Sequence, residues 1–165
     1  RAAEVSGRAC GGGGELVLSC YWCMAVAPER FGLPEPRIGQ AASGGLHRLA
    51  RHMPRKWMME LVLTGAMFNA EQAARMGIVN HIAAPGPNGP DVVAEALQMA
   101  QLICSNAPLS VRASKQMIDR GLAAPDLETA FAGQYPAYEK MLASDDAAEG
   151  RKAFFEKRAP HWQGK

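Results

Sequence analysis

The strongest constraint on the fold of this chain is a run of four glycines at residues 11–14, followed directly by Glu15 and an apolar segment. Glycine has no side chain to pack and loses much conformational freedom on ordering, so such a run indicates either a flexible linker or a backbone that another group approaches closely. A linker would continue into small and polar residues, whereas residues 16–27 are largely apolar. The run therefore predicts a turn that leads into a buried helix.

A helix that starts at such a turn has a chemical consequence. The N–H groups of its first turn have no intrahelical acceptor, and the helix dipole adds about half a positive charge at the same place. The turn is therefore predicted to be a site where a developing negative charge is stabilised.

Composition limits the classes of protein. With 165 residues, 48% of them hydrophobic, the chain has the size and core of about one globular domain. Its net charge of +2 and the lack of a basic block exclude a dedicated nucleic-acid binder. Residues 16–27 are too few to span a bilayer and residues 1–8 hold no signal-peptide apolar region, so we expect a soluble, intracellular protein without a membrane partner.

Cysteine and histidine residues predict no metal site and no disulfide framework. The four cysteines are too scattered for such a framework, which fits a reducing compartment. Cys20 and Cys23 form a lone CxxC inside an apolar run, a pattern more typical of two buried small side chains than of a redox or metal pair. The histidines have no ligand-like spacing and are His47, His52, His81 and His161.

The order of predicted elements indicates an α/β core over residues 1–90 and a helical region over 91–165 that mediates oligomerisation. We expect strands at 2–6, 22–27 and 78–83, and a rigid extended loop at 28–36 where prolines recur. Helices are expected at 13–21, 46–53, 54–63 and 70–76, with Pro54 in the first turn of its helix and Asn69 as an N-cap. Four longer helices are expected at 91–106, 108–122, 126–142 and 145–157.

Two carboxylates are candidates for acid–base chemistry. Glu15 stands behind the glycine turn, and Glu35 lies between two prolines 20 positions later. If both face one cavity at about 5 Å, they repel by roughly 3 kcal/mol at an effective dielectric near 20, so one stays ionised while the other holds a proton. The alternative is that each is an ordinary solvated glutamate. The glycine run matches neither the dinucleotide nor the phosphate-loop pattern.

Six blocks, in order, resemble the crotonase (enoyl-CoA hydratase/isomerase) superfamily: AEVSGRACGGGGELVLSC, ERFGLPEPRIG, SGGLHRLAR, LTGAMFNAEQAARMGIVN, APLSVRASKQ and AAEGRKAFFEKRAPHWQGK. The resemblance runs from residue 2 to the C-terminus and implies a ClpP/crotonase-like spiral α/β fold. It covers the C-terminal portion of a full crotonase chain, so we expect an N-terminally incomplete core and impaired activity of this chain alone. The ending AFFEKRAPHWQGK is similar to the carnitinyl-CoA dehydratase-like branch.

The resemblance also implies roles for residues at the turn. Gly12 would donate one N–H of an oxyanion hole to the thioester carbonyl, and Gly11 would contact the substrate. Glu15 and Glu35 match the two glutamates that flank water in the family's hydratases, whereas its isomerases typically keep only the second. The expected reaction is addition or removal of water across an α,β-unsaturated acyl-CoA.

Further implications concern the substrate's other end and the assembly. Phe154 would line the adenine or acyl end and Lys157 would approach the CoA phosphates, although a lysine at a helix C-terminus is also an ordinary dipole partner. No cofactor is implied beyond coenzyme A as part of the substrate. The family implies a homo-oligomer, trimer or hexamer, in the cytoplasm of a bacterium or the mitochondrial matrix of a eukaryote. The alternatives are a non-catalytic chain that docks on a crotonase-type oligomer, and an isomerase or hydrolase.

Overall fold

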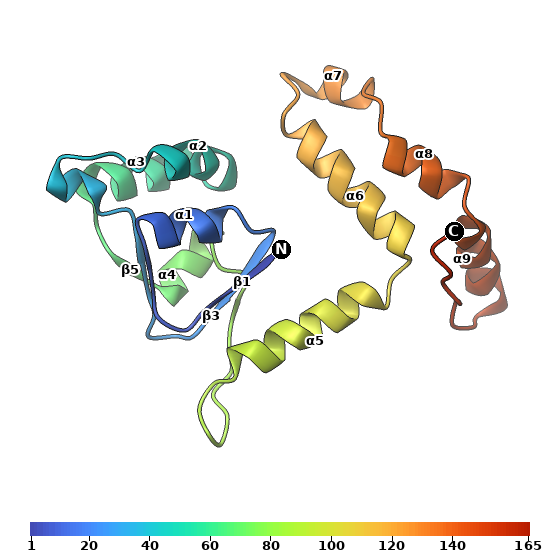
Figure 1. Cartoon of the computed structure of the whole chain (residues 1–165), viewed down its shortest axis with the longest axis horizontal. Helices are drawn as coiled ribbons and strands as arrows, with labels where there is room; N and C mark the ends of the chain where they lie inside the picture. Colours follow the sequence, from blue (N-terminus) through green and yellow to red (C-terminus); the bar gives the residue numbers. More distant parts are fainter. The chain divides into compact units, whose positions relative to one another are not determined.

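Six short strands, all within the first half of the chain, form two three-stranded sheets (Figure 1). In one sheet, β3 (Trp22–Ala25) lies between β1 (Ala2–Val5) and β6 (His81–Ile82), and both pairings are parallel. In the other, β4 (Arg30–Gly32) pairs in parallel with β2 (Arg8–Cys10) and antiparallel with β5 (Phe68–Asn69). Parallel pairs need crossover connections, and these connections carry the helices of this unit.

The structure is a computed structural model that describes residues 1–165, and the chain divides into two compact units, Arg1–Gln98 and Met99–Lys165. The first unit holds α1 (Gly12–Leu18), the 3₁₀ helix η1 (Glu35–Ile38), α2 (Ser43–His52), α3 (Arg55–Thr64) and α4 (Ala70–Arg75). Helix α5 (Val92–Cys104) contains the boundary, and the second unit continues with α6 (Pro108–Gly121), α7 (Leu127–Phe131), α8 (Pro136–Leu142) and α9 (Asp145–Glu156). None of these helices has the length and apolar character needed to cross a membrane.

Most predicted elements are present, with the following corrections. The segment 28–36 is not one extended loop, because it contains β4 and the start of η1, and the strand β2 was not predicted at all. Pro54 is the N-cap of α3 rather than a residue of its first turn. The single helix expected at 126–142 is two helices, since Pro136 begins a new one after the break at Gly133.

Core residues of the first unit come from both sheets and from the helices beside them. Phe31 of β4 and Phe68 of β5 stack with their ring centroids 6.0 Å apart. Leu49 of α2 is 1% exposed, and Val17 and Leu18 of α1 are also buried. Since α1 and α2 share this core, their relative position is set by apolar packing.

Truncation of Leu49 to alanine should therefore destabilise the first unit by about 2–5 kcal/mol, because it leaves a cavity in a packed interior. The matched control is Leu63→Ala on α3, where the leucine is 69% exposed. Urea unfolding of both variants measures the difference. Equal stability of the two variants would contradict the packing of Leu49 in the core.

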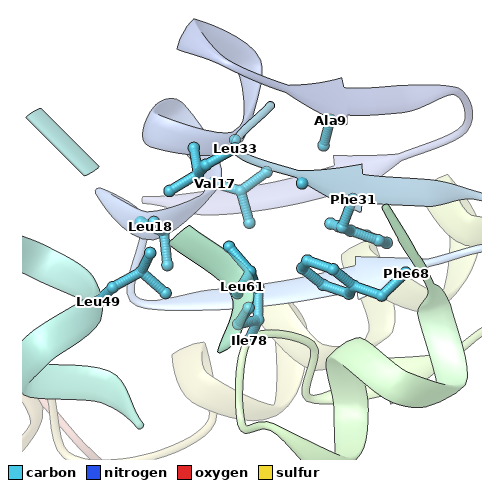
Figure 2. A pocket seen from close by; sticks show the side chains of 11 residues that line it. Ala9, Val17, Leu18, Phe31, Leu33, Leu49, Leu61, Phe68 and Ile78 are labelled. Carbon is cyan, nitrogen blue, oxygen red and sulfur yellow. The ribbon is translucent and has the colours of Figure 1, made fainter. Parts of the chain in front are cut away.

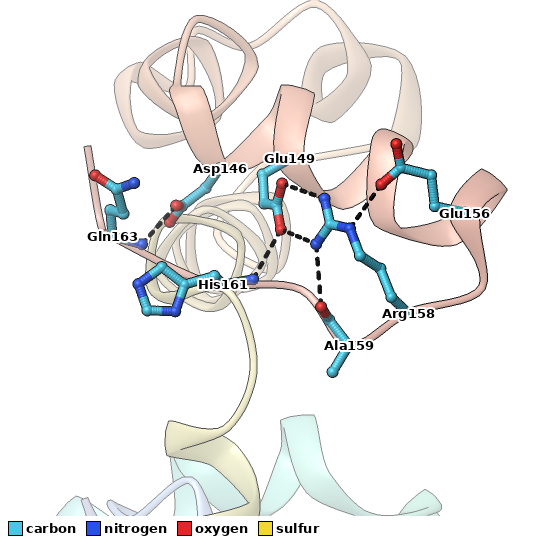
Figure 3. Close-up of polar contacts among 7 residues, drawn as sticks. All are labelled: Asp146, Glu149, Glu156, Arg158, Ala159, His161 and Gln163. Atoms are coloured by element: carbon cyan, nitrogen blue, oxygen red, sulfur yellow. Dashed lines mark hydrogen bonds and ion pairs between the residues drawn. The ribbon is translucent and has the colours of Figure 1, made fainter.

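The end of the chain folds back on α9 in the second unit through carboxylates (Figure 3). Buried Asp146 accepts hydrogen bonds from the N–H groups of Gln163 and Gly164 at 2.7 and 2.9 Å. Glu149 receives two bonds from the Arg158 guanidinium, at 2.6 and 2.9 Å, and one from the His161 N–H. These bonds, the Arg158 pair first, hold the pKa of Glu149 at about 2 instead of its usual 4.5.

Because the folded-state pKa of Glu149 is depressed, the Glu149–Arg158 pair stabilises the fold above about pH 4.5 and loses this contribution as the pH falls toward 2. Glu149→Gln should lower the Tm at pH 7, and the Tm difference from the unsubstituted chain should vanish near pH 2. Thermal unfolding followed by circular dichroism measures this, with Glu139→Gln on α8 as control. A Tm difference independent of pH would contradict the pairing.

Candidate active site

The glycine turn joins β2 to α1 with a backbone that only glycine adopts readily. Gly11 has φ 55° and ψ −127°, and its N–H donates to the Gly32 carbonyl at 3.1 Å. A Cβ on Gly14 would lie 3.2 Å from the Ala9 carbonyl oxygen, so α1 approaches β2 closely there. Gly12, the first residue of α1, is exposed, and a Cβ there would meet nothing within 4 Å.

Glu35 is the first residue of η1, and its carboxylate lies against the glycine turn. Its Oε1 is 3.2 Å from the position that a Cβ on Gly11 would occupy. Its Oε2 is buried and has no hydrogen-bond partner. A buried carboxylate oxygen without a partner is unfavourable unless another group binds it, so this atom is a candidate contact for a ligand.

Burial raises the pKa of the neighbouring Cys10 thiol, Arg8 lowers it and Glu35 raises it further.

Glu15 lies in the first turn of α1, and its carboxylate binds the start of another helix. Oε1 accepts the N–H groups of Gly44 and Gly45 at 3.0 and 2.9 Å. These amides belong to the first turn of α2, where the dipole favours negative charge; the Gly45 N–H is shared with the Ala42 carbonyl at 3.0 Å, whereas the Gly44 N–H bonds Glu15 alone. Glu15 therefore caps α2 from a distant part of the chain.

The structure brings four of the predicted site residues to one turn: Gly11, Gly12, Glu15 and Glu35. Glu35 Oε1 lies 3.2 Å from the Cβ position of Gly11. The carbonyl of Gly11 accepts a hydrogen bond from the Glu15 N–H at 3.0 Å. Gly44 and Gly45 were not predicted as partners of Glu15. The available signal was a glycine pair at the start of a helix, where an external carboxylate can bind the amides.

The other two predicted residues lie in the second unit, at the end of α9. Phe154 is 80% exposed, and Lys157 is the C-cap of α9 with a left-handed backbone. Their predicted contacts with coenzyme A stay a prediction. Three or more His, Cys, Asp or Glu side chains placed to hold a metal ion occur nowhere in the chain.

A small apolar cavity of about 20 Å³ lies directly below α1 (Figure 2). Gly14 and Leu33 line it next to the turn. The rest of its wall is mainly core side chains, among them Val17, Leu18, Phe31, Leu49, Leu61 and Phe68. No titratable side chain lines the cavity.

The arrangement of sheets, turn and helices recurs in solved structures. An enoyl-CoA hydratase from Mycobacterium tuberculosis H37Rv aligns with a TM-score of 0.85 and 38% identity, over 96% of this chain and 62% of that one. An enoyl-CoA hydratase/isomerase from Mycobacterium paratuberculosis aligns with a TM-score of 0.88 and 32% identity, over 99% and 63%. The predicted crotonase fold is thus confirmed.

The family follows from the sequence match. Residues 2–165 match the enoyl-CoA hydratase/isomerase family, and the chain belongs to it. It is 36% identical to a carnitinyl-CoA dehydratase of Salmonella typhi and 38% identical to the mouse mitochondrial enoyl-CoA hydratase domain-containing protein 2. The matches cover 99% of this chain but 62% and 55% of these relatives. The chain therefore spans little more than half of their length.

Proposed function

We propose that this chain provides the acid–base site of an enoyl-CoA hydratase-type lyase, which adds water to or removes it from an α,β-unsaturated acyl-CoA. The observation that carries the proposal is that Glu35 lies beside Gly11 of the glycine turn with one buried oxygen lacking a partner, while Glu15 follows the same turn on α1 with its carboxylate held by the amides of Gly44 and Gly45. The names of the relatives support the same reaction class.

The turn would stabilise the charge that develops on the thioester. When water adds to the β-carbon, electrons move from the double bond onto the thioester oxygen to give an enolate. The N–H of Gly12 is the proposed donor, since Gly12 is the first residue of α1 and is exposed. The Gly11 N–H is already bonded to Gly32, so its proposed contact with the substrate does not use this proton.

The two carboxylates would move the protons. One accepts a proton from water as the water oxygen bonds to the β-carbon, and the other donates a proton to the α-carbon as the enolate collapses. The reaction leaves their protonation states exchanged, and proton transfer between them or through solvent restores the starting state. Dehydration runs through the same steps in reverse. Two carboxylates at one turn favour this reaction over an isomerisation that uses one.

Replacement of either carboxylate by its amide should lower kcat for crotonyl-CoA hydration by about 10²–10⁴-fold, because a glutamine neither accepts nor donates the transferred proton. The variants are Glu15→Gln and Glu35→Gln, with Glu60→Gln on the exposed face of α3 as matched control. Absorbance of the conjugated thioester measures the rate, and crotonobetainyl-CoA serves as a second substrate.

An unchanged rate in both glutamine variants would reject the acid–base roles. If the protein as obtained is too slow to assay, residues 2–165 can replace the matched portion of the Salmonella dehydratase, and the same variants are compared in that chimera. Failure to bind any acyl-CoA would favour the non-catalytic docking alternative. Product analysis separates hydration from isomerisation and thioester hydrolysis.

We further propose that the chain assembles as a homo-oligomer through its helical second unit. Large apolar side chains of this unit are mostly exposed: Leu127, Phe131, Phe154 and Phe155 are 75–86% exposed. Exposed apolar surface of this kind is typical of a surface that another molecule covers. Phe154 and Lys157, the residues proposed to bind coenzyme A, lie on α9 and at its C-cap, next to the exposed Phe155.

Light scattering after size exclusion should therefore give a mass three or six times the 17.7 kDa of one chain. Phe131→Glu should shift the mass toward the monomer, because it puts a charge on the most exposed of these side chains. Glu128→Gln, on the same helix, is the control. A monomeric mass at all concentrations tested would contradict the assembly.

A further inference from the structure

The segments that carry Glu15 and Glu35 each also carry glycines, and these glycines lie against the carboxylate of the other segment. Gly11, at the start of the helix that holds Glu15, contacts Glu35. Gly44 and Gly45, which follow Glu35 along the chain, bind Glu15. The two segments therefore position each other's carboxylates.

The contact at Glu15 is the tighter of the two. Both amide bonds end on one oxygen, Oε1, which leaves Oε2 without a bond from these amides. Oε2 is only 2.9 Å from the position that a Cβ on Gly44 would occupy, and the carboxyl carbon is 3.2 Å from it. Any side chain at position 44 would therefore displace the carboxylate from the amides. The close fit requires bare backbone at this residue.

The backbone that holds Glu15 is itself fixed. Leu49, one and a half turns further along α2, is 1% exposed in the core. A Cβ on Gly45 would lie 3.2 Å from Leu33 Cδ1, so this end of α2 also packs closely on the segment before Glu35. Because the start of α2 packs against core side chains, its amides hold the carboxylate in one orientation.

We propose that Gly44 is a positioning residue for catalysis: its N–H and its missing side chain, together with the Gly45 N–H, orient the Glu15 carboxylate toward the substrate. This inference rests on the proposed hydratase function. Gly44 does not touch the reacting atoms itself, and its effect on the rate passes through Glu15.

Gly44→Ala tests the proposal in the same crotonyl-CoA assay. The added methyl group should lower kcat by about 10- to 100-fold, the loss expected from a small misplacement of a catalytic group, and leave KM within about twofold. Gly7→Ala is the matched control, because a Cβ there would meet nothing within 4 Å and the residue has no left-handed backbone. Equal kcat values for the two alanine variants would overturn the proposal.

A double-substitution cycle separates positioning from a general structural effect. In the Glu15→Gln background, Gly44→Ala should cause little further loss, since the group that it orients no longer transfers a proton. The same fold-loss in both backgrounds would overturn the positioning role. An unchanged rate for Glu15→Gln alone would instead reject the proposed function, which distinguishes the two failures.

Amide hydrogen exchange decides the matter if Gly44→Ala does not fold. In Glu15→Ala, exchange at the Gly44 amide should become at least about tenfold faster, since it loses its acceptor, and exchange at the Gly45 amide should change less, since it keeps its bond to the Ala42 carbonyl. Exchange at Arg51, on the last turn of α2, should change little. Unchanged exchange at Gly44 would overturn the contact on which the proposal depends.

Discussion

The left-handed backbone at Gly11 is the constraint on which the rest of the site depends. This conformation redirects the chain from β2 into α1. The hydrogen bond from the Gly11 N–H to the Gly32 carbonyl holds the turn against β4. A residue with a Cβ would be strained at this φ and would also press on the Glu35 carboxylate. The absence of a side chain at Gly11 therefore does two things: it lets the backbone bend, and it leaves room for the Glu35 carboxylate beside Gly11.

Glu15 joins structure and chemistry in one side chain. Its carboxylate binds two amides at the positive end of α2, an interaction that also stabilises that helix end. A glutamine at this position can still accept both bonds through its carbonyl oxygen, but it cannot transfer a proton. Substitutions at Glu15 can thus separate the capping of α2 from the proposed proton transfer.

The two units are stabilised differently. The first has an apolar core that includes Phe31 and Leu49, whereas the second holds its chain end with polar bonds to Asp146 and Glu149. Exposed carboxylate–arginine pairs lose strength in acid and in salt, and apolar packing does not. The apolar side chains of the second unit are instead largely at its surface, which is why we assign it to assembly.

Much of this site could be predicted from consecutive residues. The glycine run acts through neighbouring residues and the prolines beside Glu35 mark that carboxylate, so both are visible in the sequence, as is the Asn69 N-cap elsewhere in the fold, whereas the approach of Glu35 to Gly11 comes from the fold. Strands β2 and β4 have three residues each and too little alternation to predict. The bond from Gly44 to Glu15 spans 29 positions. Only the tertiary structure decided it, because packing in the core, not local chemistry, brings the start of α2 to that carboxylate.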